Sequence, residues 1–398
     1  MWYEPPVVER RREPVTSLKR LLACALFALS ACGPGTTDTP DAQVYPPATR
    51  VFIAGSLDHR VHVFDLETLE RVTSIAVPSG PTELHATPDG RLVWALTREG
   101  AAVVIIDTAT LSVRHQVQVG ARPTHSFIDP SYERIWVGND GSGDVSRIEL
   151  RGGAETRVLT GNGHKKMAIV TDQDGALRFV YVSNIADSTI SVLDPAASLV
   201  TNVEVGLSPH GMDYSSVTGR VYNCSGDEEN SVEVMSPDAD HVVVSRIPLP
   251  GRCGYIHVQP DGRAAYATIG TENRLVRIDL EAETVEAFRA GEFPDKFELA
   301  GERAFVSNVT EPTVSVVDLR DPTAEPRSIA IGAAVVHGNH GHRGMRLFGD
   351  RVFVPNEADH TVSVIDVETE AVIATLDGVM GPSGIAIAGA GVGTTYPR

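Results

Sequence analysis

The hydrophobic and polar positions of the chain follow a pattern that repeats roughly every forty residues. Two hydrophobic residues precede an aspartate or another polar residue and a turn-rich stretch follows, as in Val63-Phe64-Asp65 and Val364-Ile365-Asp366. The anchor positions, 39 to 48 residues apart, are Asp65, Asp107, Glu149, Asp194, Ser236, Asp279, Asp318 and Asp366. A period of this length indicates one supersecondary unit copied in tandem.

Each copy contains four short segments with the composition of β-strands. In the last full copy, Val352–Val354, Thr361–Val367 and Ala371–Leu376 are rich in β-branched and apolar residues, and Met345–Leu347 is a shorter segment. Gly, Asp and Asn separate these segments, as expected for a β-meander. Four-stranded units repeated radially form a β-propeller. We therefore expect an all-β fold of antiparallel four-stranded blades.

The order of the segments predicts how the ring closes. We label the strands of a blade A to D from the axis outwards. Residues 51–77 supply only B, C and D strands, whereas Gly384–Ala388 is a lone A strand. The last strand would then complete the first blade, giving eight blades over residues 51–388, with seven as the alternative if one copy is not a true blade. The A strands are expected to begin near Glu83, His125, Met167, Gly211, Tyr255, Phe297, Met345 and Ile385.

Several copies carry a four-residue motif of a known family. Tyr181-Val182-Ser183-Asn184, Phe305-Val306-Ser307-Asn308 and Phe353-Val354-Pro355-Asn356 resemble the Tyr-Val-Thr-Asn motif of YVTN β-propellers, and Gly381–Ala386 is similar to another of their blade signatures. The resemblance extends over about 85% of the chain. It implies the propeller fold, whereas YVTN propellers serve both as binding scaffolds and as enzyme domains.

The N-terminal segment is typical of an exported bacterial lipoprotein. Charged residues precede a short apolar run that ends at Leu29-Ser30-Ala31-Cys32, which resembles a lipobox, and Cys32 is the expected lipidation site. Residues 1–31 would be the signal peptide, with Val15 as an alternative start of translation. Gly33 after the cysteine implies an outer-membrane lipoprotein of the cell envelope, on its periplasmic or surface side. An ordinary secretory signal is the alternative.

The segments that flank the repeats lack apolar periodicity. Residues 32–50 are rich in Pro and Thr and are expected to be a tether, and residues 389–398 a C-terminal tail.

The charge of the chain excludes some classes of partner. The formal net charge is −18 and becomes about −20 once the leader before Cys32 is removed. Such acidity argues against nucleic acid as a partner and against electrostatic docking on anionic lipid. We therefore expect contact with the membrane only through the N-terminal lipid, and we expect a monomer.

Two of the four cysteines lie within the repeats. Cys224 is expected near the end of a B strand and Cys253 in the next D–A connection, so both would lie at the same face of the ring. In an oxidising compartment a disulfide is the expected state. A pair of metal thiolates is the alternative.

Histidines are concentrated where the channel mouth is expected. In a propeller, the D–A connections and the starts of the A strands surround this mouth. Eight of the thirteen histidines fall in these segments: His85, His125, His164, His210, His257, His337, His340 and His342. Neutral imidazoles are suitable ligands for Cu or Zn. The candidate metal ligands are His164 and the closely spaced His337, His340 and His342.

The few lysines are also concentrated at this mouth. The lysines that follow the leader are Lys165, Lys166 and Lys296, each near the start of an A strand. With Arg343 and Arg346 they would create an electropositive mouth that attracts an anionic group, although Glu83, Asp213 and Glu298 could instead neutralise it. The candidate ligand-binding residues are Glu83, His85, His125, Lys165, Lys166, His210, His257, Lys296, Arg343 and Arg346.

These features lead to three hypotheses on function. The first is a non-catalytic lipid-anchored propeller that binds a small anionic ligand or a protein through its channel mouth. The second is a metal-binding protein or metal-dependent enzyme that uses Cu or Zn. The third, from the family resemblance alone, is a lactonase-like hydrolase. A hydrolase would need a carboxylate–histidine pair, either Glu83 with His125 or Asp213 with His210.

Overall fold

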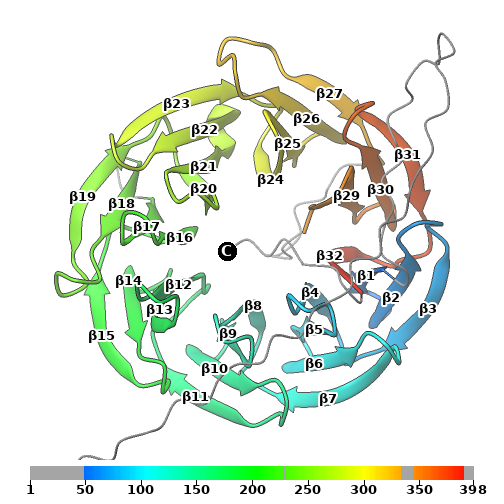
Figure 1. Cartoon of the computed structure of the whole chain (residues 1–398), viewed down its shortest axis with the longest axis horizontal. Coiled ribbons are helices and arrows are strands. Elements are labelled where there is room, and N and C mark those ends of the chain that lie inside the picture. Colours follow the sequence, from blue (N-terminus) through cyan, green and yellow to red (C-terminus); the bar gives the residue numbers. More distant parts are fainter. Residues whose placement is uncertain (1–48, 227–229, 333–343, 390–398) are drawn as a thin grey trace, which may run out of the picture. The chain divides into compact units, whose positions relative to one another are not determined.

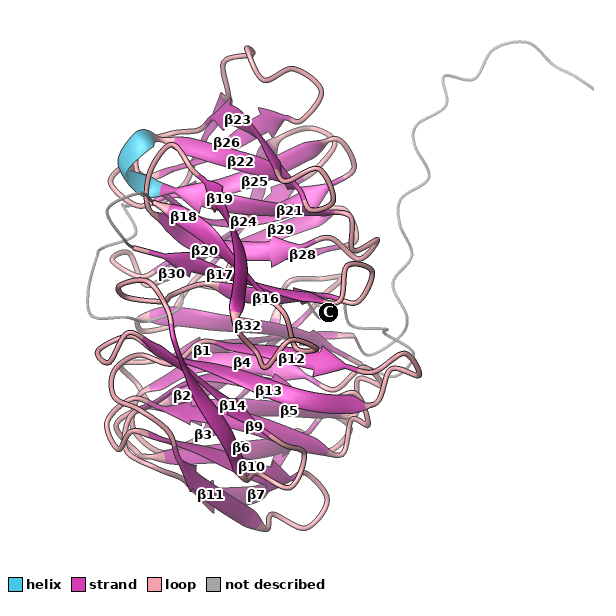
Figure 2. Ribbon diagram, turned by 90° about the vertical axis from the view of Figure 1, so that its left-hand side faces the viewer, coloured by secondary structure: helices cyan, strands magenta, loops and turns pink. Residues whose placement is uncertain are grey.

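The computed structural model describes residues 49–226, 230–332 and 344–389. Their strands form eight antiparallel sheets of four strands each, arranged as a ring (Figure 1). Figure 2 shows the ring from the side, with the strands running between its two faces. The expected all-β propeller of eight blades is thus confirmed, and the alternative of seven blades is excluded.

Two inner strands of each blade lie nearest the axis of the ring. The A strands are β4 (Pro81–Ala86), β8 (Pro123–Ile128), β12 (Met167–Thr171), β16 (Met212–Ser215), β20 (Cys253–Val258), β24 (Pro294–Ala300), β28 (Arg346–Phe348) and β32 (Pro382–Ala388). The B strands are β1 (Arg50–Gly55), β5 (Leu92–Thr97), β9 (Arg134–Asn139), β13 (Leu177–Asn184), β17 (Arg220–Ser225), β21 (Ala264–Ile269), β25 (Arg303–Asn308) and β29 (Arg351–Asn356).

The two outer strands complete each blade. The C strands are β2 (Arg60–Asp65), β6 (Ala102–Asp107), β10 (Asp144–Glu149), β14 (Thr189–Leu193), β18 (Ser231–Met235), β22 (Arg274–Asp279), β26 (Thr313–Asp318) and β30 (Thr361–Asp366). The D strands, at the rim, are β3 (Arg71–Ala76), β7 (Ser112–Gln118), β11 (Glu155–Leu159), β15 (Leu199–Glu204), β19 (Val243–Pro248), β23 (Thr284–Arg289), β27 (Arg327–Ala330) and β31 (Ala371–Leu376). One short 3₁₀ turn, η1 (Gly270–Glu272), joins β21 to β22.

The last strand closes the ring, as the sequence predicts. The first blade has the order β3-β2-β1-β32, so its A strand comes from the C-terminal end of the repeats (Figure 1). β32 pairs antiparallel with β1, with Val51 opposite Ile387 and Ile53 opposite Ile385. Strands from both ends of the described chain therefore share one sheet.

The recurring aspartate of the sequence pattern shapes the turn between the C and D strands. Oδ1 of Asp65 accepts hydrogen bonds from the backbone N–H groups of Glu67 and Thr68, each at 3.0 Å. Asp107 binds the N–H groups of Ala109 and Thr110 in the same way. Such Asx turns stabilise a reversal of the chain without a helix. The repeated pattern is thus a turn signal, and it places no chemistry at the channel.

The asparagine of the family motif ties each B strand to its neighbouring C strand. Nδ2 of Asn184 donates hydrogen bonds to the hydroxyls of Thr189 and Ser191, at 3.0 and 2.9 Å. Asn308 and Asn356 make the equivalent pairs of bonds to hydroxyls five and seven residues further on. All three asparagines are fully buried, where an amide without partners would be costly. The motif therefore serves the fold.

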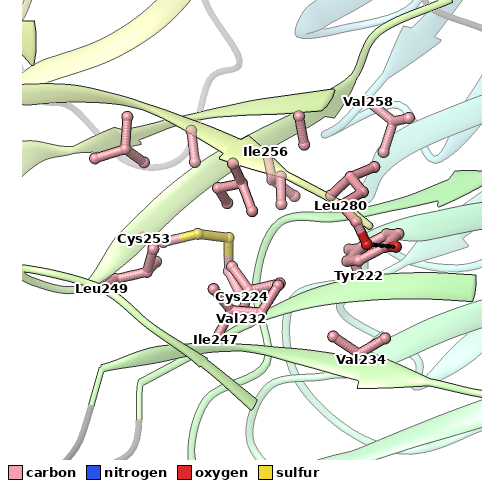
Figure 3. Close-up of a cluster of buried hydrophobic side chains, with 14 of the residues drawn as sticks. Tyr222, Cys224, Val232, Val234, Ile247, Leu249, Cys253, Ile256, Val258 and Leu280 are labelled. Atoms are coloured by element: carbon pink, nitrogen blue, oxygen red, sulfur yellow. Dashed lines mark hydrogen bonds between the residues drawn. A yellow bond between two sulfur atoms is a disulfide. The ribbon is translucent and has the colours of Figure 1, made fainter. Parts of the chain in front are cut away.

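Hydrophobic cores lie between neighbouring blades. In one of them, Val232 and Ile247 of the β16–β19 blade pack against Ile256 of the next blade (Figure 3). Cys224 and Cys253 lie in the same cluster and are joined by a disulfide, with their Cα atoms 5.5 Å apart and a sequence separation of 29. Closing a loop of this length stabilises a fold by about 3–4 kcal/mol in the chain-entropy account. The bond links a B strand to the A strand of the following blade.

The expectations for the N-terminal segment remain predictions. The signal peptide, Cys32 and the tether up to Ala48 lie outside the described residues. Within the described part of the chain, no helix has the length and apolar character needed to cross a membrane.

Candidate functional site

The strand pairing places equivalent residues of the eight A strands in two rings around the axis. In each A strand, one residue pairs with the aromatic residue that begins the four-residue motif of the neighbouring B strand. His85 is opposite Trp94 in this way, and His257 is opposite Tyr266. We call these residues the second ring: His85, Phe127, Ala168, Asp213, His257, Glu298, Arg346 and Ala386. The first ring lies two residues earlier in each strand: Glu83, His125, Lys166, Gly211, Tyr255, Lys296, Gly344 and Gly384.

The A strands begin within three residues of the expected positions, and β12 begins at Met167 as expected. The residues named as approximate starts do not all face the channel. A shift of one residue moves a side chain to the opposite face of a strand. Met167, Phe297 and Ile385 each follow a first-ring residue and are accordingly buried in cores between blades, whereas Lys166 and Lys296 belong to the first ring.

A cavity of about 670 Å³ lies along the channel and is bounded by residues of both rings. Its polar lining includes Glu83, His125, Lys166, Asp213, His257, Lys296, Glu298 and Arg346. Apolar side chains from the A strands, such as Phe127 and Ile169, line it as well. This volume falls within the range of about 300–1,000 Å³ that is usual for sites of small molecules. The first-ring position next to β4 is a glycine, Gly384. A side chain there would clash with β4, because its Cβ would lie 2.6 Å from the backbone nitrogen of Leu84.

Glu83 is the centre of the negatively charged side of the site. Its Oε1 accepts hydrogen bonds from His85 Nε2 at 2.6 Å and from the backbone N–H of Ser126 at 2.9 Å, and its Oε2 accepts from His125 Nδ1 at 2.9 Å. Burial favours the neutral acid and is the largest effect on its pKa, but the histidines outweigh it and hold the pKa of Glu83 well below its ordinary value. Glu83 is therefore a buried carboxylate that orients two imidazoles.

The hydrogen-bonded chain continues from His125 to a second carboxylate. His125 Nε2 lies 3.2 Å from His164 Nε2, and His164 Nδ1 lies 2.8 Å from Asp140 Oδ2. Burial, followed by the nearby charge of Lys166, lowers the pKa of His125 to about 3. The His125 ring is therefore neutral at physiological pH in the absence of a bound ligand.

Two lysine ammonium groups form the positively charged side of the site. Lys166 is only 6% exposed, and among the described residues its side chain has no hydrogen-bond or ion-pair partner, while its backbone N–H donates to Ser183 Oγ. Burial, followed by repulsion from Lys296, holds the pKa of Lys166 well below its ordinary value. The ammonium of Lys296 lies 3.9 Å from the ring centroid of Tyr255, in a cation–π contact. Neither ammonium is paired with a carboxylate of the described chain.

The remaining charges of the second ring are paired with each other. His257 Nδ1 lies 3.1 Å from Asp213 Oδ2, and Arg346 lies 4.0 Å from Glu298. The backbone N–H of Val258 also donates to Asp213, at 2.7 Å. Asp213 and Glu298 are thus satisfied without the two lysines.

Several expected site residues lie elsewhere. Lys165 does not reach the channel, because it is fully buried within its blade. Its ammonium donates hydrogen bonds to the carbonyl oxygen of Gly161 and to Asn184 Oδ1, the latter at 2.9 Å. The expected pairing of Asp213 with His210 is wrong, since His210 Nδ1 donates to the carbonyl oxygen of Gly254 at 2.6 Å. The other candidate residues lie outside the described part of the chain: His337, His340, His342 and Arg343.

Two residues of the site were not found from the sequence. Asp140 follows a B strand, and B strands end at the face where A strands begin, so a polar residue after the motif Trp136–Asn139 was an available signal. Tyr255 was recognised only as the start of an A strand. Its position two residues before His257 makes it a member of the first ring.

The pairing of His257 predicts a pH dependence of stability. Burial lowers the pKa of His257 and is the largest effect, but the hydrogen bond and charge of Asp213, with the charge of Glu298, raise the pKa above 6.5. A folded-state pKa above the unfolded one gives a contribution that is complete below about pH 6.5 and is lost as the pH rises through the folded-state pKa.

We therefore expect the difference in free energy of unfolding between the natural chain and a His257→Asn variant to decrease as the pH rises above 6.5. Urea denaturation over a pH series measures this difference. A difference that stays constant or grows with pH would contradict the assignment of the raised pKa to this pair.

Comparison with known proteins agrees with the fold and the motif. The chain is 24% identical over 289 residues to the uncharacterized protein YncE of Escherichia coli O157:H7, covering 67% of this chain and 71% of that protein. The chain is a β-propeller similar to YncE. No protein-family model matches it. The chain is also 26% identical over 178 residues to a 6-phosphogluconolactonase of Pectobacterium atrosepticum, covering 40% of this chain and 52% of that enzyme.

Solved structures share the fold of this propeller. Dihydro-heme d1 dehydrogenase NirN, in complex with DHE, superposes with a TM-score of 0.67 at 17% identity, over 87% of this chain and 76% of that chain. AztD of Citrobacter koseri superposes with a TM-score of 0.66 at 14% identity, over 87% and 99% of the two chains. At these identities the likeness concerns the fold alone.

Proposed function

We propose that the protein binds a small organic anion in its central channel and that the anionic group is received by Lys166 and Lys296. The observation that carries this proposal is the buried side chain of Lys166, which lines the cavity with no hydrogen-bond or ion-pair partner among the described residues. A buried ammonium without a partner is costly. An anion in the cavity would remove that cost.

The arrangement of the other charges supports an anion over a cation at this point of the channel. The carboxylates of Glu83 and Asp213 already accept two or more hydrogen bonds each. Lys296 is held over the ring of Tyr255, which fixes its position without neutralising its charge. An incoming carboxylate or phosphate would therefore find two ammonium groups that lack an anionic partner. A chain with a net charge of −18 would repel the same anion at most other places on its surface.

The test is anion binding by isothermal titration calorimetry with inorganic phosphate and 6-phosphogluconate as probes. A charge-assisted hydrogen bond in a buried site is worth about 1.5–3 kcal/mol, so Lys166→Met and Lys296→Met should each weaken binding by roughly 10–150-fold. Arg91→Met is the matched control, because it also removes one positive charge, but from an exposed side chain. Equal affinity in all four proteins, or no binding by the natural chain to either probe, would reject the proposal.

The stability of the ligand-free protein provides a second readout. Replacing a buried charge that has no partner with an apolar side chain of similar volume is often stabilising, by about 1–4 kcal/mol. Lys166→Met should therefore raise the denaturation midpoint in the absence of anion while it weakens anion binding. Loss of both affinity and stability would indicate a structural role for Lys166 instead.

A lactonase-like hydrolase is the second candidate, favoured by the hydrogen bond between Glu83 and His125 at the cavity wall. A carboxylate that orients a neutral imidazole is an arrangement suited to a general base. The partial similarity to a 6-phosphogluconolactonase gives a substrate for the assay. Hydrolysis of 6-phosphogluconolactone above the spontaneous rate, lost in His125→Ala, would support this candidate, and a rate equal to the spontaneous one would remove it.

A further inference from the structure

The ring nitrogens of His125 and His164 face each other across the channel wall. The two Nε2 atoms are 3.2 Å apart, and the ring planes are inclined by 76° with centroids 5.0 Å apart. The two histidines come from neighbouring blades, His125 from β8 and His164 from the connection before β12. Their approach therefore depends on how two blades pack.

The opposite nitrogen of each ring is fixed by a carboxylate. His125 Nδ1 donates to Glu83 Oε2 at 2.9 Å, and His164 Nδ1 donates to Asp140 Oδ2 at 2.8 Å. Because an ionised carboxylate only accepts hydrogen bonds, each Nδ1 must carry the proton. In the neutral tautomer this leaves a lone pair on each Nε2, and the two nitrogens are 3.2 Å apart. Two acceptors this close repel each other unless they share a proton or bind the same metal ion.

Histidines that bind metal ions almost always donate their second ring N–H to a carboxylate or a carbonyl oxygen, which fixes the tautomer and the orientation of the ring. Two ligands of a tetrahedral zinc ion, each with a Zn–N bond of about 2.0–2.1 Å, lie roughly 3.3 Å from each other. The observed separation of 3.2 Å matches this spacing. We propose that His125 and His164 form a binding site for a divalent transition-metal ion with a preference for imidazole, such as Zn²⁺ or Cu²⁺.

Two carboxylates and two cations lie close to the pair. The carboxylates of Glu83 and Asp140 together carry two negative charges, which equals the charge of the ion, and their side chains are only 10% and 11% exposed. Lys166 and Arg98 are positively charged neighbours that oppose the ion. Among the described residues, no group of three or more His, Cys, Asp or Glu side chains could hold a metal ion. The two imidazoles fill two of the four positions of a tetrahedral zinc ion.

The experiment uses the full chain, purified without a His tag and stripped with a chelator. Zn²⁺ is titrated in competition with a chromophoric chelator, and Co²⁺ substitution reports tetrahedral coordination through its visible absorption. We expect a single equivalent to bind and His125→Ala and His164→Ala to lose it. Asp140→Asn keeps an acceptor for His164 Nδ1 but removes the charge, and should weaken binding by about 10–100-fold.

Two control variants distinguish this pair from the remaining histidines of the chain. His62→Ala removes another buried histidine that is oriented by a carboxylate, since His62 Nε2 lies 2.8 Å from Asp58 Oδ2; Zn²⁺ binding should be unchanged. A variant with His337, His340 and His342 replaced by Ala should also retain binding. Loss of binding in that variant, equal binding by the His125 and His164 variants, or no Zn²⁺ uptake by the natural chain would overturn the proposal. In the last case a proton shared by the pair would account for the geometry.

Discussion

Deletion of residues 381–398 is expected to abolish cooperative folding of the ring, because it removes β32 and leaves the first blade with three strands. β32 pairs along β1, and its Ile385 and Ile387 are 1% and 5% exposed. Burial of one such side chain stabilises by about 1.5–3 kcal/mol, and the deletion would also expose the facing apolar residues of β1. Whole domains are stable by only about 5–15 kcal/mol, so the loss of the strand should exceed what the fold tolerates.

Urea denaturation followed by far-ultraviolet circular dichroism, together with limited proteolysis, measures the effect. Deletion of residues 390–398 is the matched control, because it shortens the same end of the chain but leaves β32 (Pro382–Ala388) intact. The control should unfold at the midpoint of the full chain. A cooperative transition at that midpoint in the longer deletion would show that β32 is not needed to close the ring.

The closure of the ring could be predicted from the sequence because it depends on features that repeat. Each turn of the kind formed at Asp65 and Asp107 carries its own aspartate, and the motif asparagine ties a B strand to a C strand. Because these features recur in several copies, the pattern can still be recognised when one copy departs from it. The lone strand at the end of the repeats and the missing one at their beginning then allow only one way to complete the first blade.

The channel could be predicted only in part, because its chemistry is carried by residues that differ between copies. The composition indicated correctly that histidines and lysines gather at the A strands. It did not resolve which residues of each strand face the channel, so that Lys165 was expected there together with Lys166, although only Lys166 lines the cavity. Alternation in an isolated strand of five or six residues is too weak to fix which face is inward.

Contacts between side chains were the most difficult feature to predict from the sequence. Lys165 and Lys166 are adjacent and chemically identical, yet one is bound to Asn184 within a blade and the other lines the channel. Asp213 pairs with His257 of the next blade, although His210 is closer in sequence. Both outcomes depend on contacts between different strands, which no local pattern encodes.

The contacts between blades also give the two proposals a common structural element. Glu83 receives His85 from its own strand and both Ser126 and His125 from the neighbouring A strand. Glu83 lines the proposed anion cavity and orients the ring of His125, one of the two histidines of the proposed metal site. The same carboxylate therefore contributes to the stability of the fold and to the organisation of the site.

Replacement of Glu83 by Ala is accordingly expected to destabilise the protein by about 3–5 kcal/mol, the usual cost of removing one partner of a buried ionic pair. The donors left behind are the buried N–H groups of Ser126 and His125 together with that of His85, and each would lose its acceptor. Urea denaturation of the variant and the natural chain gives the difference in free energy of unfolding.

Glu83→Gln is the control, because it removes the charge of Glu83 but keeps the size and shape of its side chain. The amide oxygen can still accept from Ser126, and its N–H can donate to His125 Nδ1 once the His125 ring changes tautomer. The proton would then lie on His125 Nε2 and donate to His164 Nε2, 3.2 Å away. We expect this variant to cost no more than about 1–2 kcal/mol, in the range of ordinary buried hydrogen bonds, but to bind Zn²⁺ more weakly, since the lone pair that faces the ion is lost. If Glu83→Gln destabilised the fold as much as Glu83→Ala, the negative charge of Glu83 would be its dominant contribution to stability, and the hydrogen bonds that an amide can retain would contribute little.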